Sequence, residues 1–385
     1  MKKTAFILFL SVFFFVLSTA SGWAADNEPY KIGAIVAVTG NASFLGDPQR
    51  NTLEMVVDII NEEGGINGRP VELVLYDTES NASRAVTLAR RLITRDNVLA
   101  VVGPSTSGES MAVIPVVNRA EVPMIAFGAS TRIAEPVEER KWVFKVVPGD
   151  DLAIRLKYDY MKRNGIDKIA IATASTDYGI SGRQHMRELA PEYDIDIVFD
   201  DTYGPGETDL TALLTRIRGT EAQAIINWSI GRTQIVITRN WKQLGMTIPL
   251  YQSYGFGSAR NIEMAEGAAE GVIVPVSRIV IADLIADDDP HAPVVKRYKR
   301  LYEERFNEGV SVFGGHAWDA MFQLRDALAE VGPNRSAIRE YMENISGFVG
   351  NNSIFNRSPQ DHVGLDMDAY VMVKVKDGDW AIIDE

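Results

Sequence analysis

Cysteine is absent from this chain of 385 residues. Its absence excludes disulfide bonds, zinc sites made of thiolates and cysteine nucleophiles. Basic residues are also few, because 39 Lys and Arg stand against 52 Asp and Glu and give a formal net charge of −13. Binding to the phosphate backbone of nucleic acid needs clustered Lys and Arg. We therefore expect no nucleic-acid partner.

Motifs of catalysis and of cofactor or metal binding are missing as well. The four histidines do not stand in the spacing of a metal site, and no phosphate-binding loop of the Gly-x-x-x-x-Gly-Lys type occurs. The nearest match to an enzyme motif is Gly103-Pro104-Ser105-Thr106-Ser107, where a nucleophile elbow would need glycine in place of Ser107. We expect no cofactor, no metal and no catalysis, and a serine enzyme using Ser105 or Ser107 stays an alternative.

The N-terminal segment has the layout of a secretory signal peptide. Lys2 and Lys3 precede an apolar run at residues 5–17, and cleavage is expected after Ala24, so residues 1–24 are assigned to the signal. The run is about 13 residues long, whereas a membrane-spanning helix needs about 20, although an uncleaved anchor stays an alternative. Without cysteine the mature chain cannot be a lipoprotein, and we expect a free protein in a bacterial periplasm.

Beyond the signal, strand-like runs alternate with amphipathic segments of helix length, which is typical of parallel sheets with helices on both faces. Strands are expected at residues 31–38, 71–77, 98–103, 124–127, 143–146, 168–173, 195–200, 222–227 and 250–252, with a final hairpin at 370–375 and 381–383. Helices are expected at residues 52–63, 82–96, 108–119, 150–164, 179–190, 210–218, 233–244, 294–306 and 317–330. The predicted class is α/β with two doubly wound units, whose strand-to-helix loops meet at one edge of each sheet.

Two polar loops are expected side by side at such an edge. Ser105, Thr106 and Ser107 stand at the start of the helix predicted at 108–119, and Gly128-Ala129-Ser130-Thr131 follow the next strand. The N-terminus of a helix carries unpaired N–H groups and the positive end of the dipole, which favour a ligand carboxylate. For the first loop, a serine that only caps the helix is the alternative.

Aromatic side chains also gather in predicted loops beyond the strand ends. They are Phe44 next to Leu45, Tyr178, Trp228 and Tyr254. A single aromatic residue is usually part of a core, but several at one sheet edge are typical of a ligand cleft. We therefore count Trp228 and Tyr254 among the candidate ligand residues.

These residues resemble the type I periplasmic substrate-binding proteins, specifically the leucine/isoleucine/valine-binding group that serves ATP-driven importers. The resemblance covers nearly the whole mature chain. Its motifs are Ile32-Gly33 to Thr39-Gly40, Leu45-Gly46-Asp47, residues 61–70, Tyr76-Asp77, Val102-Gly103-Pro104 with Ser107, residues 122–125, Asp177-Tyr178-Gly179 and Ala317-Trp318-Asp319-Ala320. The family implies two α/β lobes joined by three crossovers, which close on a ligand by hinge motion. By this resemblance residues 25–147 and 276–355 form lobe 1, and residues 148–275 and 356–385 form lobe 2.

The resemblance also implies ligand roles, position by position. Ser107 corresponds to the serine that grips the α-carboxylate of the ligand, and Ser130 corresponds to a threonine that touches both carboxylate and ammonium. The carbonyl of Gly128 would meet the ammonium. Tyr178 corresponds to a tyrosine of the second lobe. Phe313 and Leu45 fall where residues of the side-chain pocket lie, and Leu45 replaces an aromatic residue.

One departure from the family concerns charge. Where the family pairs the ligand ammonium with an acid, this chain has Tyr254, within Gln252-Ser253-Tyr254-Gly255-Phe256-Gly257. A buried ammonium without a counter-charge costs several kcal/mol. Either another acid reaches in, for which Asp177 is the nearest candidate, or the ligand lacks the ammonium. A shift of the loop by one or two residues is the third explanation.

The resemblance implies the periplasmic solute-binding protein of an ABC transporter. Such a protein, expected to be a monomer, would bind a branched-chain amino acid or a related small carboxylate and deliver it to a membrane permease. An aromatic or other carboxylate or amide without an amine is the second hypothesis, favoured by Trp228, Tyr178 and Tyr254. A sensor that presents its ligand state to a membrane receptor is the third.

Overall fold

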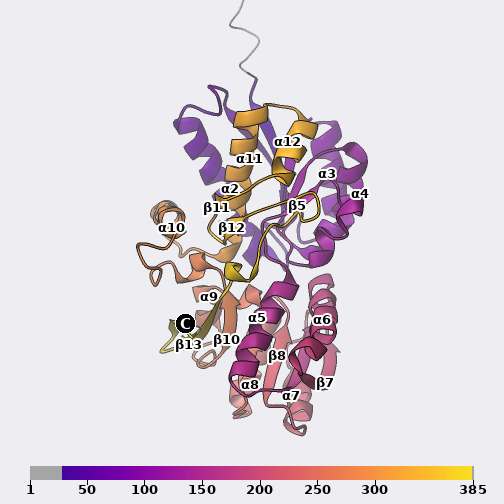
Figure 1. The fold of residues 1–385 in the computed structure, drawn as a ribbon, viewed down its shortest axis with the longest axis vertical. Helices are drawn as coiled ribbons and strands as arrows, with labels where there is room; N and C mark the ends of the chain where they lie inside the picture. The colour runs from indigo at the N-terminus through magenta and orange to yellow at the C-terminus, as the bar shows by residue number, and fades with distance from the viewer. Residues whose placement is uncertain (1–27, 384–385) are drawn as a thin grey trace, which may run out of the picture.

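The computed structural model describes residues 28–383 and shows two α/β lobes stacked along the long axis of the molecule (Figure 1). The predicted signal peptide at residues 1–24 lies outside the described residues. The first lobe contains a parallel sheet with the strand order β2-β1-β3-β4-β5. Its strands are β1 (Tyr30–Val36), β2 (Val71–Asp77), β3 (Ala100–Val102), β4 (Met124–Ala126) and β5 (Val143–Lys145).

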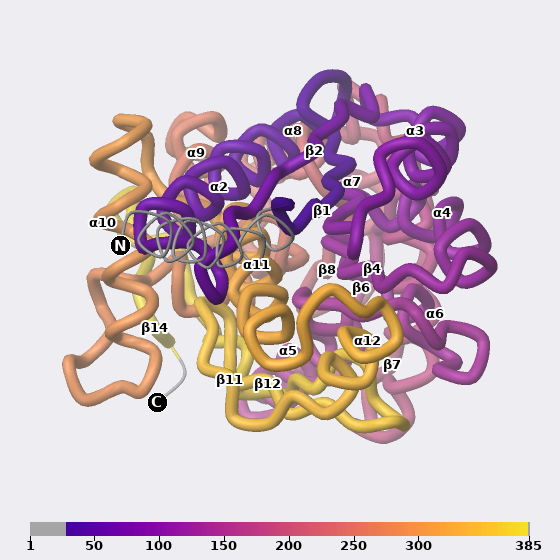
Figure 2. The backbone as a smooth tube through the Cα atoms, turned by 90° about the horizontal axis from the view of Figure 1, so that it is seen from above, coloured from indigo at the N-terminus to yellow at the C-terminus, as the bar shows by residue number. Residues whose placement is uncertain are grey.

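Helices cover both faces of this sheet because side chains alternate along its strands. In β1, Ile32, Ala34 and Val36 belong to the larger core cluster, whereas Ile35 belongs to a separate one with residues of α3 and α4. Seen from above, α3 and α4 lie on one side of β1 and β4, and α2 and α11 lie on the other (Figure 2). These helices are α2 (Ser43–Glu62), α3 (Ala82–Thr94), α4 (Ser107–Ala120) and α11 (Val312–Val331), followed by α12 (Arg335–Glu343).

The second lobe contains a mixed sheet with the strand order β14-β13-β10-β9-β8-β6-β7. Its strands are β6 (Lys168–Ala174), β7 (Asp196–Tyr203), β8 (Ala224–Trp228), β9 (Leu250–Gln252), β10 (Ile273–Val276), β13 (Val371–Lys376) and β14 (Asp379–Ile382). Its helices are α5 (Asp150–Arg163), α6 (Asp177–Leu189), α7 (Thr211–Arg218), α8 (Arg232–Gln243) and α9 (Ala259–Met264). The predicted C-terminal hairpin is confirmed, because β13 and β14 pair antiparallel around Asp377 and Gly378, both at positive φ.

The chain passes between the lobes three times, as the predicted fold requires. It passes from β5 to α5, and from β10 to α10 (Ala292–Phe306), which packs against α2. It returns from the small hairpin of β11 (Phe348–Val349) and β12 (Ile354–Phe355) to β13. The lobe boundaries expected at 147/148, 275/276 and 355/356 stay predictions, and the second of them would separate Val276 from the rest of β10.

Several predicted loops are parts of regular elements, which corrects the sequence-based placement. Helix α2 begins nine residues before the expected residue 52, so Phe44 and Leu45 are helical. Gly46 and Pro48 are residue types that usually interrupt a helix, so the sequence conceals this start. The structure requires glycine at position 46, because a Cβ there would lie 2.1 Å from the carbonyl oxygen of Ala37, in the chain after β1. Tyr178 lies in the first turn of α6, and Trp228 is the last residue of β8.

A backbone constraint at Gly103 fixes the start of the first polar loop. Gly103 has φ of +89°, and a Cβ there would lie 2.2 Å from the carbonyl oxygen of Ile35 in β1.

We expect Gly103→Ala to lower the free energy of unfolding by more than about 2 kcal/mol, because left-handed strain adds to the steric clash. Urea denaturation measures this loss. Gly68→Ala is the matched control, since Gly68 has φ of +80° but no atom within 4 Å of its Cβ position. Equal losses in both variants would contradict the role of the clash.

A buried carboxylate holds the turn between β11 and β12 on α11. Asp319 accepts hydrogen bonds from the backbone N–H of Asn351 at 2.7 Å and of Asn352 at 3.3 Å, and from the side-chain amide of Asn352 at 2.8 Å. Burial nevertheless raises the pKa of Asp319 to about 7, because desolvation outweighs these three bonds. The folded protein therefore binds a proton at this site more strongly than the unfolded chain does.

This raised pKa predicts how stability depends on pH. The contribution of Asp319 is fully present below the pKa of about 3.9 that an unfolded Asp has, and it is lost as the pH rises toward about 7. The stability of the wild type relative to Asp319→Asn should therefore fall between about pH 4 and pH 7. Urea denaturation across this range checks the slope, with Asp326→Asn, a partly exposed position of the same helix, as control. A difference that does not change with pH would exclude this assignment.

Candidate functional site

The candidate residues of both lobes meet at the carboxyl ends of the two sheets. The loops after β3 and β4 come from the first lobe, and the first turn of α6, the end of β8 and the segment after β9 come from the second. Ser107, Ser130, Tyr178 and Tyr254 are all buried at this meeting point. The topology therefore brings together residues that are up to 147 positions apart, from Ser107 to Tyr254.

Ser105 and Thr106 use their hydroxyl groups inside the first lobe. The Ser105 hydroxyl donates to Oε1 of Gln49 at 2.6 Å and accepts from the backbone N–H of Ala37 at 2.9 Å. Thr106 is the N-cap of α4 and forms a capping box, in which its hydroxyl accepts from the N–H of Glu109 at 3.2 Å and donates to the Glu109 carboxylate at 2.8 Å. The cap of α4 is thus Thr106 and not a serine, and ligand contact by Ser105 or Thr106 stays a prediction.

Ser107 and Ser130 lie next to each other, as expected for loops of adjacent strands. The Ser107 hydroxyl accepts a hydrogen bond from the backbone N–H of Ser130 at 3.2 Å. Gly128 permits this approach, since a Cβ at that position would lie 2.8 Å from Cα of Ser107. Ser107 is also the first residue of α4, so its hydroxyl stands at the positive end of the helix dipole.

An aromatic wall lines the lobe interface from both sides. Phe44 contacts Phe313 edge to face, with ring centroids 5.9 Å apart, and its ring fills the space beside Gly231 of the second lobe. Leu45, on the same helical turn as Phe44, is buried. On the opposite side the ring of Tyr178 packs against the ring of Trp228, with ring centroids 5.5 Å apart.

Tyr254 pairs with a residue that sequence reasoning missed. Its hydroxyl lies 2.8 Å from Nε2 of His316, and its ring packs against Tyr370 with centroids 5.0 Å apart. Burial, with a smaller effect of Lys145, lowers the pKa of His316 to about 3, so the imidazole is neutral. Burial also raises the pKa of Tyr254, which keeps the phenol protonated. The only signal for His316 in the sequence is its place one helical turn after Phe313.

Asp177, the acid considered as a substitute, stands at a different place. It is partly exposed in the first turn of α6, and its carboxylate lies against Gly108 of α4. Tyr254 instead follows β9 and faces α11 through His316. The neutral pair of Tyr254 and His316 thus occupies the position where the family resemblance leads one to expect an acid.

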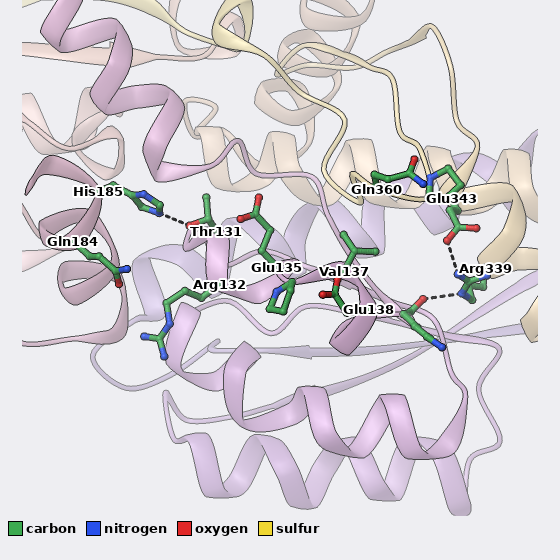
Figure 3. A pocket seen from close by; sticks show the side chains of 13 residues that line it. Thr131, Arg132, Glu135, Val137, Glu138, Gln184, His185, Arg339, Glu343 and Gln360 are labelled. Carbon is green, nitrogen blue, oxygen red and sulfur yellow. Dashed lines mark hydrogen bonds and ion pairs between the residues drawn. The ribbon is translucent and has the colours of Figure 1, made fainter. Parts of the chain in front are cut away.

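Several side-chain hydrogen bonds connect the lobes directly. Besides Tyr254 with His316, Ser130 bonds Ser181 of α6 at 2.9 Å, and Thr131 bonds Nε2 of His185 at 2.6 Å. A pocket of about 740 Å³ opens beside the contact of Thr131 with His185 and is lined from both lobes (Figure 3). The two lobes are therefore in direct contact through buried and partly buried side chains.

Two further observations concern metals and membranes. Within residues 28–383, no three His, Cys, Asp or Glu side chains gather in a way that could hold a metal ion. In the same part of the chain, none of the helices combines the length and the apolar character needed to cross a bilayer.

A family model described as periplasmic binding protein matches residues 29–379. The chain belongs to the periplasmic binding protein family. Its curated relatives agree with the resemblance to the leucine/isoleucine/valine-binding group, which is thereby confirmed. Leu/Ile/Val-binding protein homolog 7 of Brucella abortus is 23% identical over 304 residues, which cover 76% of this chain and 75% of the relative. The leucine-, isoleucine-, valine-, threonine-, and alanine-binding protein of Pseudomonas aeruginosa is 25% identical over 258 residues, covering 66% of this chain and 68% of the relative.

Solved structures confirm the predicted fold. An extracellular ligand-binding receptor from Rhodopseudomonas palustris HaA2 superimposes with a TM-score of 0.87 at 24% identity, covering 93% of this chain and 100% of that chain. The branched-chain amino acid transporter substrate binding protein LivJ from Streptococcus pneumoniae, in complex with isoleucine, superimposes with a TM-score of 0.81 at 23% identity, covering 92% and 98%. The α/β fold of this periplasmic binding protein, with two lobes, is therefore that of its type I relatives.

The bond between Ser130 and Ser181 predicts a measurable effect on closure. Ser181→Ala removes one buried hydrogen bond worth about 0.5–1.5 kcal/mol, so the ratio of closed to open molecules should fall about 2- to 12-fold. Because the chain has no cysteine, one cysteine can be introduced in α3 and another in α7 to carry spectroscopic labels for distance measurement. Gln184→Ala is the control, since exposed Gln184 bonds only Glu188 of its own helix. An unchanged distance distribution in Ser181→Ala would show that this bond does not hold the lobes.

Proposed function

We propose that this protein is the periplasmic ligand-binding component of an ABC importer and that it closes on a small carboxylate without an amino group. Membership of the periplasmic binding protein family and the signal-like segment at residues 1–24 support the location and the transport role. The ligand would be enclosed between the lobes, released to a membrane permease, and bound by one copy of the chain. The choice of ligand class rests on the charges around the cleft.

The carboxylate of the ligand would bind at Ser107 and Ser130. Ser107 begins α4, a helix of 14 residues, where backbone N–H groups and the helix dipole favour an anion. Beneath the second loop the Lys145 ammonium donates to the carbonyl groups of Ala129 at 2.7 Å and Ser130 at 2.9 Å. Burial lowers the pKa of Lys145 to about 8, with Asp150 and Asp151 acting in the opposite direction, so this lysine is mostly charged at neutral pH. A positive charge here favours an anion and opposes an ammonium.

The observation that carries the proposal is the contact of Tyr254 with His316. Both side chains are buried and neutral, so the position can offer a ligand hydrogen bonds but no negative charge. An α-ammonium enclosed there would lose its hydration without gaining a counter-ion, at a cost of several kcal/mol. A ligand without the amine avoids this cost.

The body of the ligand would lie among aromatic rings. Phe44 and Phe313 come from the first lobe, and Tyr178 and Trp228 come from the second. Flat or branched apolar groups pack well on such rings, and aromatic pairs add to the area they bury. Aromatic and branched aliphatic carboxylates are therefore the classes that we propose.

A branched-chain amino acid is the second candidate, and the names of the relatives favour it. The Pseudomonas aeruginosa relative is named for leucine, isoleucine, valine, threonine and alanine. That ligand class would need an acid near Tyr254 in place of the neutral pair. A sensor role would use the same cleft, and it would show as binding to a membrane receptor in place of a permease.

Thermal shift with matched ligand pairs tests the amine. 4-Methylpentanoate differs from leucine, and 3-phenylpropanoate from phenylalanine, only in lacking the amino group. We expect the carboxylates to stabilise the protein by about 2.7 kcal/mol at 100 times their dissociation constant, and the amino acids to give no shift. Stabilisation by leucine alone would refute the amine-free class, and no shift with any member of an amino-acid, carboxylate and amide panel would refute the binding role.

The same panel with Tyr254→Glu shows whether Tyr254 is the deciding position. A carboxylate there should allow amino acids to bind and should weaken the amine-free acids, because like charges repel in a cleft that excludes water. Tyr254→Phe is the control, since it removes the bond to His316 without adding charge. Equal behaviour of the Glu and Phe variants would show that charge at this position does not select the ligand.

A further inference from the structure

A second buried lysine lies behind the aromatic wall of the second lobe. Lys157 projects from α5 and has no solvent-exposed area. Its ammonium nitrogen lies 4.3 Å from the centroid of the Trp228 ring. Among residues 28–383, no hydrogen-bond partner contacts this nitrogen. Within this part of the chain, the indole face is thus the contact that the structure gives to the Lys157 nitrogen.

Two more buried polar atoms at this place have no hydrogen-bond partner, one in Thr173 and one in the indole itself. Thr173 of β6 stands opposite Trp228 of β8 in the parallel ladder, so both side chains project from one face of the sheet. In the described part of the chain, Oγ1 of Thr173 and Nε1 of Trp228 are buried without a hydrogen-bond partner. Gly182 of α6 allows the indole edge to pack closely on this helix, because a Cβ there would lie 2.2 Å from Nε1.

An arrangement of this kind is costly unless something completes it. A buried amine loses its hydration, and burial alone lowers the pKa of Lys157 well below its usual range. Contact with an indole face offsets only part of such a loss. A carboxylate beside the nitrogen would satisfy it with a charge-assisted hydrogen bond, and the Thr173 hydroxyl could donate a second one.

Trp228 connects this place to the cleft. Its ring leans on Tyr178, which lies in the first turn of α6 at the lobe interface. Lys157 approaches the same indole from α5, whose first residue, Asp150, accepts a hydrogen bond from the Thr131 hydroxyl of the first lobe at 3.1 Å. Lys157 therefore belongs to the same end of the second lobe as the proposed ligand site.

We propose that Lys157 and Thr173 form a subsite for a second carboxylate, and that the ligand of this protein is a small dicarboxylic acid. The inference rests on the proposed function, because the first carboxylate occupies Ser107 and Ser130. The second carboxylate would give the Lys157 nitrogen the hydrogen-bond partner that the described residues do not supply.

Calorimetry with probes that differ by one carboxylate tests the subsite. Terephthalate is compared with benzoate, and adipate with hexanoate, at one fixed pH. The wild type should bind the better dicarboxylate at least 10-fold more tightly than its monocarboxylate partner. In Lys157→Met this preference should vanish, while the affinity for the monocarboxylate stays unchanged.

Matched variants separate this role from a structural one. Lys162→Met removes an exposed lysine from the same helix and should bind as the wild type does. Thr173→Val keeps the amine and should weaken only the dicarboxylate, so the subsite remains testable if Lys157→Met does not fold. Equal affinity of the wild type for both members of each pair, or a preference for the dicarboxylate that persists in Lys157→Met, would overturn the subsite. Failure of every carboxylate to bind would instead refute the proposed function.

Discussion

The hydrogen bond between Tyr254 and His316 joins the lobes where the cleft would otherwise need a charge. Its two side chains come from the segment after β9 and from α11, so the contact crosses from one lobe to the other. Both groups are buried, and burial keeps both neutral. At this contact the second lobe therefore offers hydrogen-bonding groups without negative charge. The ligand class that we propose rests on this constraint.

The chain path makes such a contact available. Each sheet presents the carboxyl ends of its parallel strands to the other lobe, and three crossings between the lobes keep these ends facing each other. Ser107 and Ser130 then stand opposite Ser181 and Tyr178 without any local sequence signal that relates them. Hinge motion can separate the residues of the first lobe from those of the second and leave each sheet intact, because each lobe packs its own sheet between helices.

Much of this architecture could be predicted from the sequence. Periodicity alone located most strands and helices, and the strand-to-helix loops after β3 and β4 identified Ser107, Gly128 and Ser130 as neighbours. The start of α2 could not be predicted, because Gly46 and Pro48 read as a break, whereas Gly46 is needed where the helix meets the chain after β1. His316 and Lys157 were missed for another reason. Each lies within a helix, and only tertiary contacts show that its polar atom reaches Tyr254 or Trp228.

The charge of the whole chain does not describe the charge of the cleft. The formal net charge is −13, yet the buried side chains next to the candidate site include two lysines, Lys145 below the loop of Ser130 and Lys157 behind Trp228. Fields from exposed acids are screened by water and salt over about 10 Å, whereas buried groups act through a medium of lower polarity. We propose that an enclosed ligand responds to the lysines, to the Asp150 carboxylate beside Thr131 and to the neutral pair of Tyr254 and His316 more than to the acidic surface. An acidic protein can in this way select an anion.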